Sequence, residues 1–132
     1  MALAAAIALA GSPAETDTFA AGAIERGEVV FQKCYACHSV MPGETGLSGP
    51  NLAGVVGRTI ASVPGFEYSD ALEALPTRGY RVWTQAALDA FLTSPEEFAP
   101  GTAMTFVGLP DAKERSDLMA YLAATRDGLG RE

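Results

Sequence analysis

Cys34-Tyr35-Ala36-Cys37-His38 forms the pattern C-x-x-C-H, which is typical of covalent c-type haem attachment. The two thiols lie about one helical turn apart, so each can add to a vinyl group of the same porphyrin, and the adjacent histidine can bind the iron. The chain has 2 cysteines and 1 histidine, and all of them lie in this pentapeptide. The sequence therefore predicts one covalently bound haem c, attached through Cys34 and Cys37.

Three other interpretations of the pentapeptide are weaker on chemical grounds. A structural zinc site takes four N or S ligands, so carboxylates would have to complete the shell here. A thioredoxin-like redox pair needs a βαβ pattern beside the motif, and no β-rich alternation flanks it. A disulfide across two intervening residues would close a very short loop and would constrain the unfolded chain little.

Length, composition and charge limit what surrounds the motif. The chain has 132 residues, a mass of 13.7 kDa and 48% hydrophobic residues, which predicts one domain with a packed core. The formal net charge is -7, and haem propionates would make the surface more acidic still. This charge disfavours nucleic acid as a partner.

The N-terminal residues allow several interpretations. Met1 to Ala10 are almost entirely Ala, Leu and Ile, and they end in an A-x-A pattern typical of an export signal. The run lacks a preceding Lys or Arg and is shorter than the roughly 20 residues that cross a bilayer. We expect residues 1–19 to be a signal-peptide remnant, a membrane-anchor stub or a flexible linker, with a polar linker at residues 11–18. We expect residues 20–132 to form the monohaem domain.

Four helices are expected, without any strand. The first spans about residues 20–33 and contains Gly27, which costs about 1 kcal/mol relative to alanine. This glycine is explained if another helix crosses closely there, and otherwise it is merely tolerated. Ser69 caps a short second helix, and Thr84 caps a third that ends before Pro95. Asp111, with a glutamate three residues on, starts a final helix that ends at Gly128. The apolar stripe of the third helix consists of Ala87, Leu88, Phe91 and Leu92.

Turn residues dominate the segment between the motif and Ser69, which predicts a loop region wrapped on the apolar surface of a cofactor. They are Pro42, Gly43, Gly46, Gly49, Pro50, Gly54 and Gly57.

The sixth ligand of the iron has to come from another residue type, because the chain has 1 histidine. Met1 is terminal, Met119 lies in the final helix, and Met41 is too near the motif to reach the opposite haem face easily. Met104 lies in a loop far enough along the chain. By spacing alone Met104 is either a ligand or a methionine that fills a gap in the core.

Several further motifs occur in the same order as in a known family. The chain resembles a class I cytochrome c of the mitochondrial and bacterial c2 type, from about Ala20 to the last helix. The matching motifs are Gly27 with Phe31, Cys34-x-x-Cys37-His38, Gly49-Pro50-Asn51-Leu52, Gly57-Arg58, Gly65-Phe66, Tyr68-Ser69-Asp70-Ala71, Trp83 and Pro100-Gly101-Thr102-Ala103-Met104.

The resemblance implies an all-α class I cytochrome c fold, with about four to five helices and long ordered loops around one haem. It makes His38 and Met104 the axial iron ligands, a pair that favours a relatively high reduction potential. The Pro50 carbonyl would accept a hydrogen bond from His38. Gly27 would be the crossing point for the final helix. The remaining residues expected around the haem are Arg58, Tyr68, Trp83 and Thr102.

The implied function is one-electron transfer between periplasmic or membrane-bound redox complexes by a monomer, soluble or membrane-tethered. An iron with six ligands has no vacant position for substrate, so no enzyme activity and no catalytic residue are expected. One alternative is a dedicated electron-transfer subunit of a periplasmic oxidoreductase. Another is a haem enzyme or gas sensor in which Met104 is labile.

The chain departs from the family pattern at two places. Phe91 stands where many relatives carry a tyrosine, so a hydroxyl that can hydrogen-bond the Met104 sulfur is missing. Glu96 and Glu97 stand where relatives that dock on acidic partners carry lysines; the alternative is that both belong simply to a solvated helix end. We therefore expect the redox partner to present a neutral or basic surface, with Lys33 as the lone lysine beside the first cysteine.

Overall fold

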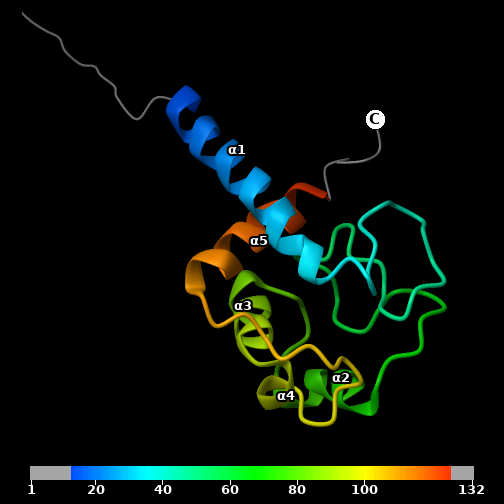
Figure 1. Cartoon of the computed structure of the whole chain (residues 1–132). Helices are drawn as coiled ribbons and strands as arrows, with labels where there is room; N and C mark the ends of the chain where they lie inside the picture. Colours follow the sequence, from blue (N-terminus) through cyan, green and yellow to red (C-terminus); the bar gives the residue numbers. More distant parts are fainter. Residues whose placement is uncertain (1–12, 126–132) are drawn as a thin grey trace, which may run out of the picture.

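The computed structural model describes residues 13–125, with side chains described from residue 22 onward. The expectations for residues 1–10 and for the helix end at Gly128 lie outside these residues. The α-helices are α1 (Pro13–Val30), α2 (Asp70–Glu73), α3 (Gln85–Thr93), α4 (Pro95–Phe98) and α5 (Ala112–Thr125), with 3₁₀ turns at Phe31–Lys33 and Leu75–Arg78. Figure 1 shows α1 crossing α5 on one side of the molecule, with α3, α4 and α2 grouped below them.

The all-α prediction is confirmed for the described part of the chain. Its β-structure is limited to one isolated antiparallel bridge between Thr59 and Val82. None of the described helices is long and apolar enough to cross a membrane. Long loops join the helices, as expected, and Figure 1 shows the largest of them, between the first 3₁₀ turn and α2, folded beside the helices.

Gly27 is the crossing point of α1 and α5, as the family resemblance implies. The residue is buried, and a Cβ atom there would overlap the Asp117 carbonyl oxygen and lie 2.7 Å from Tyr121 Cβ. The Phe31 and Tyr121 rings pack beside the crossing with centroids 5.5 Å apart. The glycine therefore allows the two helix backbones to approach more closely than any side chain would permit.

The predicted helix caps are present. Ser69 Oγ accepts the Leu72 N–H at 3.3 Å, and Thr84 Oγ1 accepts the Ala87 N–H at 3.0 Å. Asp111 Oδ1 accepts backbone N–H groups from the first turn of α5, at 2.8 Å and 3.4 Å. These side chains satisfy donors that the first turn of a helix leaves unpaired.

Two helix boundaries differ from the sequence predictions. α1 begins at Pro13 and so includes residues 13–18, where the sequence favours a polar linker. Proline is tolerated in a first helical turn because the N–H groups there have no intrahelical partner. The short helix α4 follows α3 directly, because Ser94 is extended, with φ of -159°, and its Oγ accepts the Glu97 N–H at 3.3 Å.

One hydrophobic core underlies both the helices and the loops. The apolar stripe predicted for α3 is buried in it, and the loops contribute Val55 and Ile60, which are 2% and 3% exposed. Cys34, Tyr68 and Met104 are partly buried and pack against the same core. The core therefore connects the pentapeptide to the distant loop that carries Met104.

Candidate haem site

His38 is held in a defined orientation by the Gly49-Pro50 segment. Its Nδ1 lies 2.8 Å from the Pro50 carbonyl oxygen. A carbonyl oxygen can only accept a hydrogen bond, so Nδ1 carries the proton and Nε2 keeps a free lone pair. A Cβ atom at Gly49 would come within 2.6 Å of Nδ1 and 2.7 Å of Nε2, which explains the glycine beside the ring. The ring is thus prepared as a metal ligand with its second nitrogen fixed.

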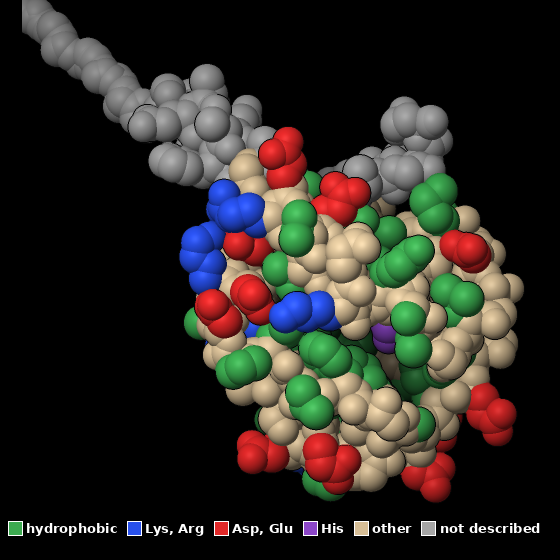
Figure 2. All heavy atoms as spheres, in the orientation of Figure 1, with side chains coloured by type: hydrophobic (Ala, Val, Ile, Leu, Met, Phe, Trp, Pro, Cys, Tyr) green, Lys and Arg blue, Asp and Glu red, His purple; other side chains and the backbone are tan. Residues whose placement is uncertain are grey.

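The surroundings of His38 favour the neutral ring. Burial lowers its pKa, the hydrogen bond to the Pro50 carbonyl acts in the opposite direction, and the positive charge of Arg58 lowers the pKa further. A neutral imidazole is the form that coordinates metals. Figure 2 shows the purple histidine at a hollow of the surface bordered by hydrophobic side chains.

The two cysteines lie on the turn that leads to His38. The Cys37 and His38 N–H groups both donate to the Cys34 carbonyl, at 3.1 Å and 3.0 Å. Burial raises the pKa of the Cys34 thiol to about 11, while Lys33 lowers it and Cys37 raises it. A redox-active or nucleophilic cysteine has a depressed pKa, so this environment speaks against a thioredoxin-like pair.

No group of three or more His, Cys, Asp or Glu side chains that could hold an ion occurs among the described residues.

Arg58 carries the clearest sign of a missing partner. Its Nη1 donates to the carbonyls of Asn51 at 2.9 Å and Ala53 at 3.4 Å, but its buried Nε has no partner among the described residues. Burial lowers the pKa of Arg58, and nearby Tyr68 opposes that shift. Buried polar groups are nearly always hydrogen-bonded, so this donor fits an anionic acceptor such as a haem propionate.

Tyr68 and Trp83 lie in the segments around Arg58. The Tyr68 hydroxyl accepts the Val63 N–H at 3.0 Å and retains its own proton for donation. The backbone N–H of Trp83 donates to the Arg58 carbonyl at 2.8 Å, and the Trp83 side chain is buried. His38, Pro50, Arg58, Tyr68 and Trp83 thus belong to one connected part of the structure.

Met104 and Thr102 lie on a separate loop that reaches the same core. The Met104 N–H donates to Thr102 Oγ1 at 3.3 Å, and Met104 is partly buried. At the far end of the loop, the Leu109 N–H donates to the Leu92 carbonyl at 2.7 Å. The loop is therefore fixed to the end of α3 beyond Met104.

Asn51 is a positioning residue. The sequence placed it in a family motif but did not predict this role. Its Nδ2 donates to the carbonyls of Met41 at 2.7 Å and Glu44 at 2.9 Å. These bonds close the loop between His38 and Pro50, so they support the histidine orientation indirectly. The Gly-Pro-Asn run marked this segment in the sequence, but only the folded loop gives Asn51 its partners.

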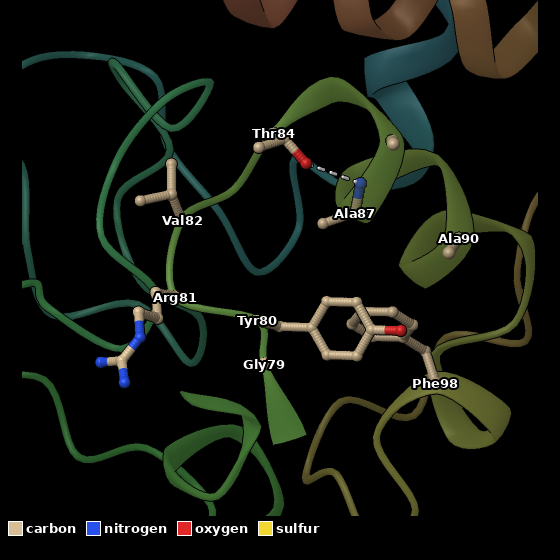
Figure 3. Close-up of a pocket in the computed structure, with 9 residues that line it drawn as sticks. Gly79, Tyr80, Arg81, Val82, Thr84, Ala87, Ala90 and Phe98 are labelled. Atoms are coloured by element: carbon tan, nitrogen blue, oxygen red, sulfur yellow. Dashed lines mark hydrogen bonds between the residues drawn. The ribbon is translucent and has the colours of Figure 1, made fainter. Parts of the chain in front are cut away.

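Two surface cavities lie apart from the cysteines, His38 and Met104. One of about 470 Å³ is lined by Tyr80, Val82, Phe98 and neighbouring residues, and Figure 3 shows the Tyr80 and Phe98 rings, which are tilted by 55° to each other, side by side at its wall. The other, of about 420 Å³, lies along the loop from Pro42 to Pro64 and includes Arg58. The candidate site is therefore defined by the contacts of its residues and not by either cavity.

Comparison with known proteins decides the family. The chain is 43% identical over 97 residues to cytochrome c-550 of Ancylobacter novellus, covering 74% of this chain and 90% of that protein. It is 42% identical over 105 residues to cytochrome c2 of Rhodomicrobium vannielii, covering 80% and 81%. The chain belongs to the class I c-type cytochromes. No protein-family model matches it.

A solved structure agrees with this membership. Cytochrome cH from Methylobacterium extorquens has a TM-score of 0.67 and 37% identity, covering 76% of this chain and 97% of that one. As a class I cytochrome, the chain carries one covalently attached haem c and acts as an electron carrier. The unpaired Arg58 Nε, the fixed His38 ring and the partly buried thiol of Cys34 all fit such a group.

Proposed function

We propose that this class I cytochrome attaches its haem through Cys34 and Cys37 and holds the iron between His38 and Met104. The observation that carries the proposal is the 2.8 Å contact from His38 Nδ1 to the Pro50 carbonyl, which leaves Nε2 as the nitrogen available to iron. Met104 packs on the same core as Cys34 and is the methionine of the Pro100-Gly101-Thr102-Ala103-Met104 motif.

The remaining site residues stabilise this arrangement. Pro50 fixes the histidine tautomer. Arg58, Tyr68 and Trp83 provide hydrogen-bond donors for the haem propionates and shield them from water. Thr102 accepts the Met104 N–H. When bound, the haem supplies a one-electron couple between Fe(III) and Fe(II), and the chain supplies its ligands and a low-dielectric pocket.

A six-coordinate iron has no vacant position for substrate, so we infer a carrier without enzyme activity. The carrier would exchange electrons with membrane-bound or periplasmic redox complexes of a respiratory or photosynthetic chain, as a periplasmic monomer formed by residues 20–132. Residues 1–19, of which 13–19 already belong to α1, would be a signal remnant, a tether or a linker.

Absorption spectroscopy of the ferric protein tests the ligand assignment. Methionine ligation gives ferric haem a weak long-wavelength band, which Met104→Ala should abolish. Met41→Ala is the matched control, because Met41 is exposed, and it should leave the band unchanged. A band that survives in Met104→Ala would contradict the proposed ligand pair.

A further test is Pro50→Ala, which retains the backbone carbonyl and should leave the His38 ligation intact.

A further inference from the structure

The loop that carries Met104 begins with a tight turn at residues 99–102. The Thr102 N–H donates to the Ala99 carbonyl at 2.9 Å and closes the turn, and Gly101 has φ of +90°. Proline followed by a residue with positive φ is typical of a type II turn. The Gly101 N–H belongs to the central peptide of the turn, which takes no part in the closing bond. The rotation of this peptide is what distinguishes a type II turn from a type I turn.

Glu96 supplies a partner for that central peptide. From the first turn of α4, its Oε2 accepts the Gly101 N–H at 3.1 Å. A hydrogen bond to a carboxylate is stronger than one between neutral groups, so it favours the orientation that the peptide has here. Glu97, the next residue, is also exposed, but its carboxylate has no hydrogen bond or ion pair with the described residues.

The turn is connected directly to Met104. Thr102, its last residue, accepts the Met104 N–H on Oγ1 at 3.3 Å. The other end of the loop is fixed by packing, because a Cβ atom at Gly108 would overlap the Thr93 carbonyl oxygen and lie 3.2 Å from that of Leu92. The loop is thus closely packed beyond Met104, whereas before Met104 its conformation depends on the turn that Glu96 holds.

We propose that Glu96 is a positioning residue that keeps the turn in the conformation in which Met104 reaches the iron, and so restrains dissociation of the sulfur. This inference rests on the proposed assignment of Met104 as axial ligand. It gives Glu96 a role distinct from that of Glu97, whereas the sequence alone allowed both to be a solvated helix end.

Competition by imidazole tests the proposal, because this neutral ligand binds ferric iron only when the methionine sulfur leaves. Glu96→Ala should raise the imidazole affinity of the ferric holoprotein about threefold to tenfold, the range of a single hydrogen bond. Glu96→Gln, which keeps an acceptor without the charge, should fall in between. Glu97→Ala removes the same charge one residue away and should change the affinity by less than about twofold.

Hydrogen exchange of the Gly101 amide, followed by NMR, provides a readout independent of iron ligation. Exchange should accelerate in Glu96→Ala and remain unchanged in Glu97→Ala. In a Thr102→Val background the Glu96→Ala effect on imidazole affinity should shrink, because the connection to Met104 is already broken.

Equal effects of Glu96→Ala and Glu97→Ala on imidazole affinity would overturn the proposal, and so would an unchanged Gly101 exchange rate. If Met104 is not a ligand, imidazole affinity will not respond to Glu96 and the positioning role fails too. The ferric long-wavelength band distinguishes the two failures, because it reports whether Met104 binds iron, whereas Gly101 exchange reports whether the Glu96 bond forms.

Discussion

At the scale of single residues, backbone groups set the chemistry of the side chains in the site. The Pro50 carbonyl selects the His38 tautomer, and the absence of a side chain at Gly49 leaves space for the ring. At Phe91 the missing group is on the side chain, because the tyrosine of many relatives would carry a hydroxyl there. Its ring is buried and lies 5.2 Å from the Trp83 ring and 6.1 Å from the Phe98 ring.

Phe91→Tyr is expected to raise the midpoint potential. A hydroxyl that donates to the Met104 sulfur withdraws electron density from it and stabilises Fe(II) relative to Fe(III). A weak hydrogen bond of this kind corresponds to a shift of about 20–60 mV for a one-electron couple. Potentiometric titration measures the shift. Phe98→Tyr is the control, because its ring lies against Tyr80 at 4.7 Å. An unchanged or lower potential in Phe91→Tyr would reject this explanation.

At the scale of elements, the contact between α1 and α5 combines close backbone packing with a buried carboxylate. Asp117 on α5 is 9% exposed and lies 3.1 Å from both Arg26 Nε on α1 and Lys113 Nζ on its own helix. Lys33 and Glu114 form a second, more exposed pair at 3.7 Å. The helix crossing can therefore be tested sterically at Gly27 and electrostatically at Asp117.

Gly27→Ala should destabilise the holoprotein by about 3 kcal/mol, because the new Cβ forces the two helices apart. Gly22→Ala on the same helix is the matched control, since its Cβ would meet only the flexible end of Arg26, at 3.2 Å. That control should be neutral or stabilising by about 0.5–1 kcal/mol. Denaturant unfolding measures both changes, and equal stabilities of the two variants would show that the crossing tolerates a side chain.

Acid should weaken the α1–α5 contact through Asp117. Burial raises the pKa of this carboxyl, but the hydrogen bonds from Arg26 and Lys113 outweigh burial and hold the pKa below its ordinary value. A depressed folded-state pKa contributes stability above the unfolded value of about 4, and this contribution is lost as the pH falls through the folded-state pKa.

Asp117→Asn should therefore lower the free energy of unfolding at pH 7 by about 1 kcal/mol, a modest value because both cations are largely exposed. The difference from the unsubstituted chain should shrink below about pH 4, where Asp117 itself becomes neutral. Urea unfolding across this pH range tests the prediction. Glu114→Gln, which removes the exposed pair, should have little effect at any pH, and a constant Asp117→Asn difference would argue against the linkage.

At the scale of the whole molecule, charge is distributed unevenly. Figure 2 shows Lys and Arg gathered at one side of the face that contains the histidine, intermixed with Asp and Glu, while acidic groups are scattered over the rest of its border. Ion pairs join Arg26 of α1, Lys33 of the following 3₁₀ turn and Lys113 of α5 to carboxylates of α5. With a formal net charge of -7, the chain should attract cationic and repel anionic reaction partners.

The rates of oxidation by small charged complexes test this expectation. The rate with a cationic cobalt phenanthroline complex should fall as salt increases, and the rate with anionic ferricyanide should rise. Glu97→Gln should lower the cationic rate up to about twofold, and Lys33→Ala should change either rate by less than that. A steep loss of the anionic rate in Lys33→Ala, with no response to Glu97→Gln, would instead indicate a lysine-centred docking surface.

Features governed by local chemistry were predictable from the sequence. The caps at Ser69, Thr84 and Asp111 depend on residues within a few positions of each other, and each has the predicted bond. The start of α1 and the separate helix α4 were missed, because Pro13 and Pro95 are compatible both with a helix end and with a first turn.

The sequence by itself determined the family, the covalent haem and the all-α class, because these depend on ordered motifs and on a fixed pattern of caps and turns. Only the tertiary structure decided that Arg26 pairs with Asp117 at the α1–α5 crossing, that Arg58 Nε is buried without a partner among the described residues, and that Glu96 accepts the Gly101 N–H. The physical reason is that tertiary contacts can join residues that lie far apart in the sequence. Arg26 and Asp117 are 91 positions apart, and no local pattern records which distant groups folding will bring within hydrogen-bonding distance.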